Sequence, residues 1–171
     1  MTTENALVVL GLDPGSRCTG FGVVQERSGQ LTLLETGTIR PRSSQSISLR
    51  LGMIMEEILA IVDRWTPHEA AIEDVFVARN TASALKLGQA RGAALAACGS
   101  RRLHVSEYAP TLVKKTLVGA GRAEKSQVAF MVGQMLGCKP QWAEDSSDAL
   151  AVALCHCNQR RLSRLTAAAA P

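Results

Sequence analysis

An uninterrupted apolar stretch near the start of the chain, from Ala6 to Leu12, constrains the fold more than any other feature. It ends at Asp13-Pro14-Gly15. A short apolar run that stops at turn residues is typical of a buried strand. Two further strands are predicted at residues 20–25 and 31–39, joined by a turn around Ser28-Gly29. The chain therefore begins with three strands in meander order.

Helices and strands alternate after this meander. A helix is predicted over residues 48–65, where apolar residues recur at helical spacing, and a short strand follows at 70–75. The remaining pattern predicts a strand at 103–107 and helices at 81–98, 111–118, 123–136 and 145–161. This order predicts an α/β fold with a mixed central sheet of about five strands flanked by helices. Residues 1–161 are expected to form a single domain, and the Ala-rich tail 162–171 is expected to be disordered.

Four acidic residues from three parts of the chain are candidates for one site: Asp13, Glu73, Asp145 and Asp148. Asp13 directly follows the first strand, and Glu73 lies in the fourth. If these strands are neighbours, both side chains reach the same end of the sheet, where sites form in α/β folds. Asp145 and Asp148 are three residues apart at the start of a helix and share one face. Carboxylate oxygens suit Mg²⁺ or Mn²⁺, and two such ions can promote phosphodiester hydrolysis.

Each of these acids has a simpler interpretation. Asp13 favours the first position of a turn, and Asp145 and Asp148 favour the first turn of a helix, where they complement its dipole. Glu73 is harder to explain in this way, because a carboxylate within an apolar strand is unfavourable to bury without a partner. From the residues alone, both interpretations stay open.

The middle of the chain is strongly basic, which indicates a polyanionic partner. Residues 79–125 contain nine basic and two acidic residues, a net charge of +7, whereas the rest of the chain carries −3. The basic residues are Arg79, Lys86, Arg91, Arg101, Arg102, Lys114, Lys115, Arg122 and Lys125. A phosphate backbone is a natural partner for such a stretch, although a solvated basic face is the simpler alternative.

Five cysteines at irregular spacing do not form a disulfide framework. Cys155-His156-Cys157 matches no zinc pattern, because a second pair of ligands is missing. The first five residues are polar and unlike a secretory signal, and no apolar run is long enough to span a membrane. We therefore expect a cytoplasmic protein without a membrane partner and with reduced thiols.

Four segments together resemble the RuvC family of Holliday-junction endonucleases. They are LDPGSRCTGFGV (12–23), IEDVFVARNTASALKLGQARG (72–92), GAGRAEKSQV (119–128) and DSSDALAVALCH (145–156). The resemblance covers the chain from about residue 7 to residue 156 and implies a ribonuclease H-like fold. It also implies a homodimer that resolves four-way DNA junctions in recombination and repair by paired nicks, with Mg²⁺ as cofactor and 5′-phosphate products. RuvA and RuvB, the branch-migration proteins, are partners implied by the same resemblance.

The resemblance also assigns roles to residues. The family's catalytic and metal-binding carboxylates fall on Asp13, Glu73, Asp145 and Asp148, and its DNA-contacting lysines fall on Lys114 and Lys125. Many relatives carry Arg at the position of Thr111, so one backbone contact is expected to be absent here or replaced by Lys115.

Three further assignments concern the segment 76–96. Phe76 matches a family aromatic that is associated with stacking on a base near the crossover. Arg79, in the same polar stretch, is also assigned to DNA binding. Gly88, Gly92 and Ala96 lie four residues apart on one helix, which permits close approach of another backbone. This stripe is expected either to pack on the protein's own sheet or, as the family's dimer contact implies, to form a two-fold dimer interface.

Two other functions remain open at this point. One is a different ribonuclease H-like nuclease, such as an RNA–DNA hybrid cutter. The other is a non-catalytic module that binds junctions. Cleavage of hybrids in preference to junctions would indicate the first, and binding without nicks in Mg²⁺ would indicate the second.

Overall fold

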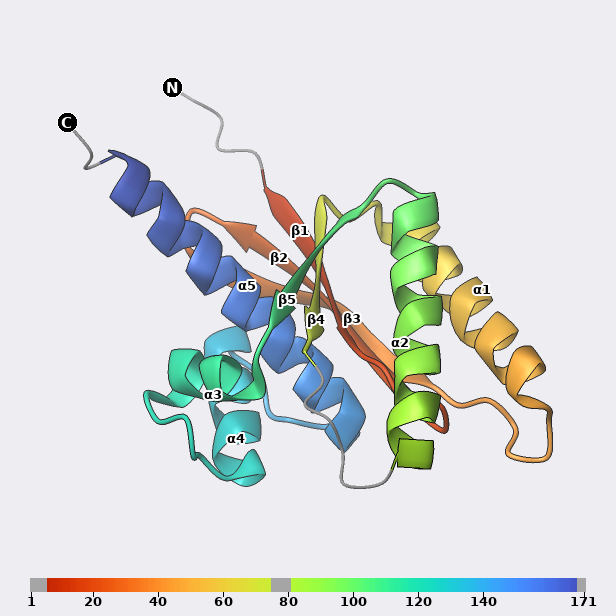
Figure 1. Ribbon diagram of the computed structural model, residues 1–171. Coiled ribbons are helices and arrows are strands. Elements are labelled where there is room, and N and C mark those ends of the chain that lie inside the picture. The colour runs from red at the N-terminus through yellow and green to blue at the C-terminus, as the bar shows by residue number, and fades with distance from the viewer. Residues whose placement is uncertain (1–5, 75–80, 169–171) are drawn as a thin grey trace.

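The computed structural model describes residues 6–74 and 81–168, and its strands form one mixed sheet (Figure 1). The strands are β1 (Leu7–Asp13), β2 (Thr19–Arg27), β3 (Gln30–Ile39), β4 (Glu69–Glu73) and β5 (His104–Tyr108). Their order in the sheet is β3-β2-β1-β4-β5. The meander β1–β2–β3 is antiparallel, whereas β4 lies parallel to both β1 and β5. The predicted mixed sheet of five strands is confirmed.

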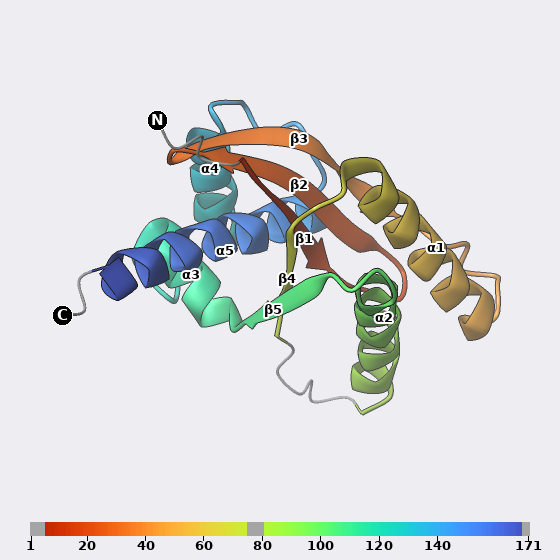
Figure 2. The same ribbon diagram turned by 90° about the horizontal axis from the view of Figure 1, so that it is seen from above.

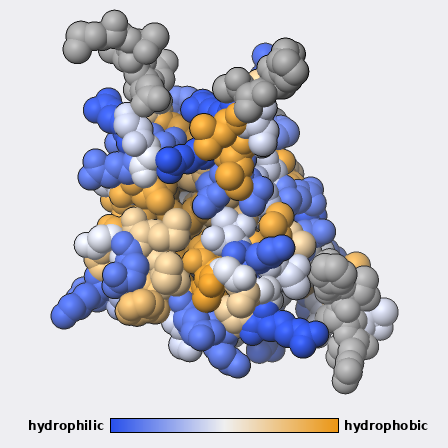
Figure 3. Space-filling view, turned by 90° about the vertical axis from the view of Figure 1, so that its left-hand side faces the viewer, coloured by the Kyte–Doolittle hydropathy of each residue, from blue (hydrophilic) through white to orange (hydrophobic). Residues whose placement is uncertain are grey.

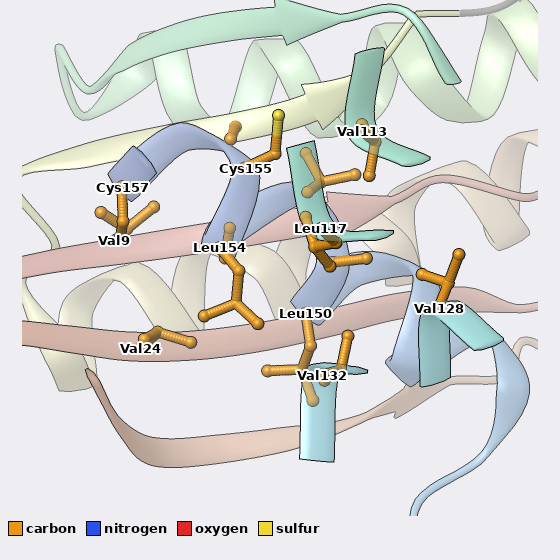
Figure 4. Close-up of a cluster of buried hydrophobic side chains, with 14 of the residues drawn as sticks. Val9, Val24, Val113, Leu117, Val128, Val132, Leu150, Leu154, Cys155 and Cys157 are labelled. Carbon is orange, nitrogen blue, oxygen red and sulfur yellow. The ribbon is translucent and has the colours of Figure 1, made fainter. Parts of the chain in front are cut away.

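The helices cover both faces of this sheet. They are α1 (Ile47–Trp65), α2 (Thr81–Ser100), α3 (Pro110–Val118), α4 (Lys125–Leu136) and α5 (Glu144–Ala168). Figure 2 shows α1 and α2 on one side of the sheet and α3, α4 and α5 on the other. Side chains of β1 alternate between the two layers, because successive residues of a strand point to opposite faces. Val9 joins the cluster under α5, which Figure 4 shows, and Leu10 joins the cluster under α1 and α2.

Three glycines of β1 and β2 let α5 approach the sheet closely. A Cβ atom at Gly11 would lie 2.1 Å from the carbonyl oxygen of Ala149, and one at Gly20 would lie 1.9 Å from that of Asp145. At Gly22 it would lie 2.4 Å from the side chain of Leu150. Any larger residue would therefore push the first half of α5 away from the strands. The position of this helix decides where Asp145 and Asp148 lie.

Most element boundaries differ from the prediction by one to three residues, and two differences bear on the site and the tail. The strand β4 ends at Glu73, so this carboxylate lies at the carboxyl end of the strand, where it is half-buried. The helix α5 continues to Ala168, so residues 162–168 are helical and not a disordered tail. Leu, Arg and Ala favour helix, and a helix already held by packing extends readily into such a sequence.

The face of the molecule over α3, α4 and α5 mixes hydrophilic and hydrophobic residues (Figure 3). The exposed large apolar residues on these three helices are Leu112, Phe130, Leu162 and Leu165. No helix in the described part of the chain has the length and apolar character needed to cross a membrane.

The residues Cys155-His156-Cys157 lie in the middle of α5, where all three are buried. His156 Nδ1 lies 2.8 Å from the hydroxyl of Tyr108, and its Nε2 lies 2.7 Å from Oε2 of Glu69. Burial is the main cause of a lowered pKa of His156. These contacts satisfy both ring nitrogens within the protein, as a buried histidine requires.

Candidate active site

Two of the four candidate carboxylates leave the sheet at the same end. Leu12 of β1 pairs with Ile72 of the parallel strand β4. The next residue along each strand is an acid, Asp13 in β1 and Glu73 in β4. Both are half-buried. The first and fourth strands are therefore neighbours, which is the condition for a shared site, and both carboxylates lie at the carboxyl end of parallel strands.

The first turn of α5 brings the other two carboxylates to this end. Asp145 follows the first residue of the helix, and Asp148 lies on the same face. The hydroxyl of Ser146 donates a hydrogen bond of 2.8 Å to the carbonyl of Gly37 in β3. This bond, together with the close approach at Gly20, fixes the start of the helix against the sheet.

The charges of the other three carboxylates act on Asp13. The pKa of Asp13 is raised to about 7, mainly by burial and then by the charges of Asp148, Glu73 and Asp145. Burial and the charge of Asp148 also raise the pKa of Glu73. Like charges disfavour the ionised form of one another, so the cluster is unfavourable without a neighbouring cation.

Basic side chains surround the cluster. Lys125 Nζ lies 3.0 Å from Oδ2 of Asp148 and 2.6 Å from Oε1 of Glu144. Arg40 Nη2 lies 3.7 Å from Oδ2 of Asp145. The charge of Lys125 lowers the pKa of Asp13 and Glu73, and that of Lys114 lowers the pKa of Glu73. These ion pairs are partly exposed and contribute little to stability, but they bring positive charge to the carboxylates.

The donor set fits a divalent cation. All four side chains offer carboxylate oxygens, the ligands that Mg²⁺ and Mn²⁺ prefer. A cation placed among them would relieve the repulsion that raises the pKa of Asp13. Within residues 6–74 and 81–168, no three side chains of His, Cys, Asp or Glu already stand close enough to chelate an ion. The cluster therefore has the charge and chemistry for a divalent ion, with its ligands more widely spaced than in a closed metal site.

A cleft of about 180 Å³ opens beside the carboxylates. Glu73 and Asp148 line it together with two of the predicted DNA-binding residues, Lys114 and Lys125. Lys115, the suggested replacement for an arginine at position 111, is exposed and does not line this cleft. The structure thus brings two of the three predicted lysines to the site.

The remaining predicted residues are two DNA-binding candidates and the small-residue stripe on α2. Phe76 and Arg79 fall outside the described residues. Gly88, Gly92 and Ala96 are exposed on α2, and a Cβ atom built on either glycine would meet no atom of the described residues within 4 Å. The interpretation that this stripe packs on the protein's own sheet is therefore wrong. The stripe is an open surface.

Three residues at the site were missed by the sequence reasoning. Cys18 lines the same cleft as Asp145, and burial, followed by interaction with that carboxylate, raises the pKa of Cys18 to about 11. Glu144 and Arg40 complete the ion pairs described above. Glu144 directly precedes Asp145, which is a signal the sequence does offer. The pairing of Arg40 and Cys18 with Asp145 depends on how α5 docks and has no local signature.

The chain is similar to known proteins along nearly its whole length. The pattern that defines the family "Crossover junction endodeoxyribonuclease RuvC" matches residues 9–156. A protein of that description from Oleidesulfovibrio alaskensis is 57% identical over 167 residues, which cover 98% of this chain and 99% of the relative. Its counterpart from Solidesulfovibrio magneticus is 55% identical over 161 residues, covering 94% and 95%.

Among solved structures, RuvC of T. thermophilus in complex with a Holliday junction substrate superposes with a TM-score of 0.86 at 35% identity, covering 92% of this chain and 96% of that one. The likeness confirms the predicted ribonuclease H-like fold. The chain belongs to the RuvC family of crossover junction endodeoxyribonucleases.

Proposed function

We propose that this chain is a cytoplasmic, structure-specific endonuclease with one nuclease domain that resolves Holliday junctions by paired, metal-dependent nicks at the crossover. The convergence of Asp13, Glu73, Asp145 and Asp148 beside a lysine-lined cleft carries this proposal. A relative that covers nearly the same fold was solved with a Holliday junction bound, and this supports the choice of substrate.

The four carboxylates would hold Mg²⁺, for which Mn²⁺ would substitute. A bound divalent ion supplies an activated water and neutralises charge that develops on the phosphate oxygens. The chain itself contributes the placement of the ligands. Asp13 and Glu73 are fixed by adjacent parallel strands, and Asp145 and Asp148 by a helix pressed against those strands. Such rigid supports favour a defined geometry at the scissile phosphate.

Lys114 and Lys125 would attract the phosphodiester backbone to the carboxyl end of β1 and β4. Both side chains carry positive charge into the cleft that Glu73 and Asp148 line. Lys125 belongs to the first turn of α4, where backbone amide groups also favour an anion. When DNA enters, the lysine would exchange part of its contact with Asp148 and Glu144 for a phosphate, and the metal would take over neutralisation of the carboxylates.

Lys115, which lies outside this cleft, would add a contact to the junction, and Phe76 and Arg79 would add others. Phosphate contacts position DNA without reading its sequence, so Lys115 and Arg79 would bind the arms of any four-way junction, whereas Phe76 would stack on a base near the crossover. Cutting would leave a 5′-phosphate and a 3′-hydroxyl.

Two copies of the chain would act together. A junction with near two-fold symmetry presents two equivalent strands, and a two-fold dimer supplies two equivalent sites. The exposed stripe Gly88, Gly92 and Ala96 on α2 would let the helices of two copies approach closely. RuvA and RuvB would be partners of the assembled complex.

One experiment tests the proposal. The purified protein is incubated with a synthetic four-way junction, a linear duplex and an RNA–DNA hybrid, each in Mg²⁺, Mn²⁺ or EDTA. We expect paired nicks near the centre of the junction in both metals and none in EDTA. Preferential cutting of the hybrid would indicate another ribonuclease H-like nuclease, and binding without nicks would indicate a non-catalytic module.

A further inference from the structure

A second basic cleft adjoins the carboxylates, on the side of α1 and α2. It has a volume of about 510 Å³ and lies between the turn after β1, the start of α1, the first turns of α2 and Asp145 of α5. Three basic side chains line it: Arg17, Arg50 and Lys86. We propose that this cleft binds phosphates of the DNA strand on the opposite side of the scissile phosphate from the Lys114 and Lys125 cleft. The inference rests on the proposed function and names a further part of its substrate path.

The charge of the cleft favours an anion. Asp145, already among the candidate metal ligands, is the one acidic residue among the described residues of its lining. Among the ion pairs of the described residues, none involves Arg17, Arg50 or Lys86. By contrast, the same set pairs Arg40, Arg91 and Arg101 with carboxylates. Three cations that take part in no described ion pair, beside one shared carboxylate, give the described lining excess positive charge for a polyanion.

Hydrogen bonds hold the wall that carries Arg17. The amide of Gly15 donates to the hydroxyl of Thr19 at 3.2 Å, and this hydroxyl donates back to the carbonyl of Gly15 at 3.0 Å. The guanidinium of Arg50 donates to the carbonyl of Ser16. Arg50 is half-buried and therefore acts as a positioning residue for the turn, whereas Arg17 and Lys86 are exposed and free to reach a ligand.

The two clefts flank the carboxylates. Asp145 lines the Arg17 and Lys86 cleft, and Asp148 lines the Lys114 and Lys125 cleft. These two acids lie three residues apart on one helix, so the predicted metal site separates the clefts. A strand whose scissile phosphate rests on the metal site must continue in both directions, and each direction meets a basic cleft. One DNA strand that passes over the predicted metal site would therefore occupy both clefts.

The described lining indicates contact with the backbone more than with the bases. Among the described residues that line the cleft, Leu87 is the one large apolar side chain and none carries an aromatic ring for stacking. Cationic side chains neutralise phosphates without regard to sequence. The cleft would therefore set the position of the strand along the active site, and any sequence preference would come from other residues.

The test combines protein variants with single phosphate replacements. Junctions carry one uncharged methylphosphonate at each position around the cut in turn, and their affinities are measured in EDTA so that the DNA stays intact. The protein is wild type, the double variant Arg17→Gln/Lys86→Gln, or the control Arg27→Gln/Arg161→Gln. The control removes the same charge at exposed positions of β2 and α5 that line neither cleft.

We expect wild-type binding to weaken when phosphates on either side of the cut are replaced. The Arg17→Gln/Lys86→Gln variant should lose this sensitivity at a few adjacent positions on one side and keep it on the other. Its dependence of log affinity on log salt concentration should also fall by about 1.4 to 1.8, the value for two lost phosphate contacts. The control should keep the wild-type profile at every position.

The possible failures are distinguishable. Wild-type protein that cuts junctions in Mg²⁺, together with a double variant whose phosphate profile matches the wild type, overturns this inference and leaves the proposed function standing. An equal loss at all positions, shared with the control, also overturns it, because only the overall charge would then matter. Wild-type protein that neither binds nor cuts junctions overturns the proposed function and the inference with it.

Discussion

Lys125 Nζ lies 3.0 Å from Oδ2 of Asp148, so the first turn of α4 contributes a cation directly to the carboxylate cluster. The same ammonium group contacts Glu144, which ties the start of α4 to the start of α5. Without a metal ion, this lysine is the nearest counter-charge that the described residues provide for Asp148. An ammonium group that can bind an anion and a carboxylate that can bind a cation thus lie side by side. Binding of a phosphate to Lys125 and of a metal ion to Asp148 would replace their contact with each other.

The raised pKa of Asp13 predicts how cutting depends on pH. The carboxyl group has a pKa of about 7, so it holds a proton below this pH and its oxygens are then less able to bind a cation. At low Mg²⁺ concentration, the rate of cutting should therefore rise as the pH increases through about 7. Protons and metal compete for the same oxygens, so the midpoint should move to lower pH as Mg²⁺ increases.

Single-turnover rates at several pH values and Mg²⁺ concentrations measure this shift. Mn²⁺, which binds such ligands more tightly, should move the midpoint further than an equal concentration of Mg²⁺. A midpoint that stays in place at every metal concentration would show that Asp13 does not bind the ion.

The substitution Asp145→Asn should abolish cutting and leave junction binding largely intact. It removes one charge from the cluster but leaves both basic clefts in place. We expect the rate to fall by more than about 100-fold, since the loss of even an outer partner of a metal site costs 10- to 100-fold. Cleavage rates in Mg²⁺ and affinities in EDTA measure the two effects separately.

Asp63→Asn is the matched control for this change. Asp63 also pairs with an arginine, Arg101, at 2.6 Å, but it lies on the far part of α1 and outside the clefts beside the carboxylates. It should cut at the wild-type rate. An Asp145→Asn protein as active as this control would remove Asp145 from the metal site.

Neighbouring lysines on α3 provide a paired comparison. Lys114 lines the carboxylate cleft and is half-buried, whereas Lys115 is exposed and points elsewhere. Lys114→Ala should slow cutting at saturating DNA and reduce the salt dependence of binding by about one phosphate contact. Lys115→Ala should change binding alone and leave the rate at saturation unchanged.

Rates at saturating junction, together with affinities over a range of salt concentrations, distinguish the two lysines. Equal effects of the two substitutions on the rate would mean that proximity to the carboxylates does not matter. The role of Lys114 would then be reduced to general attraction of DNA.

Gly20→Ala should shift the start of α5 without changing any of the four carboxylates, so it tests how the position of this helix affects cutting. A methyl group there would lie 1.9 Å from the carbonyl oxygen of Asp145, so the start of α5 must shift. We expect a loss of about 1–3 kcal/mol in the free energy of unfolding, as for other overpacked sites. The cutting rate should fall by more than the loss of folded protein explains, because Asp145 and Asp148 move relative to Asp13.

Urea unfolding and cleavage rates at a temperature where the variant is fully folded test this point. Gly52→Ala is the control, because an added Cβ at this exposed position of α1 meets no atom within 4 Å. Normal cutting by a destabilised Gly20→Ala protein would show that the site tolerates a shifted helix.

The sequence predicts the sheet well and the docking of its last helix poorly. The apolar run before Asp13 indicates a buried strand, and parallel neighbours then bring Asp13 and Glu73 to one edge. These inferences need only local pattern and topology. The contacts of Asp145 with Cys18 and Arg40 depend instead on how deeply α5 sits on Gly11 and Gly20. Such a fit arises from tertiary packing, and the periodicity of α5 contains no record of it.

The end of α5 shows the same limit. Residues 162–168 have no capping signal, and their side chains up to Thr166 and Ala167 are exposed, yet the helix persists to Ala168. Its first half is buried against the sheet, so the cost of helix nucleation is already met there and extension adds one hydrogen bond for each residue. Local composition alone does not predict this extension, because it takes no account of the buried first half of the helix.

The open stripe on α2 predicts that Gly92→Leu converts a dimer to monomers. A Cβ at Gly92 meets no atom of the described residues within 4 Å, so the fold should tolerate the change and gain helix propensity. A leucine there would still separate two α2 helices packed across this stripe. Sedimentation should therefore show a monomer, and paired nicks in one junction should give way to slow single nicks.

Gly52→Leu adds the same side chain to another exposed helical glycine with open space around it. This control should stay dimeric and should nick both strands in one binding event. A cruciform plasmid reports on this directly, because paired nicks linearise it and single nicks only relax it. A Gly92→Leu protein that sediments as a stable dimer would exclude the stripe as the interface, even if its cutting were impaired.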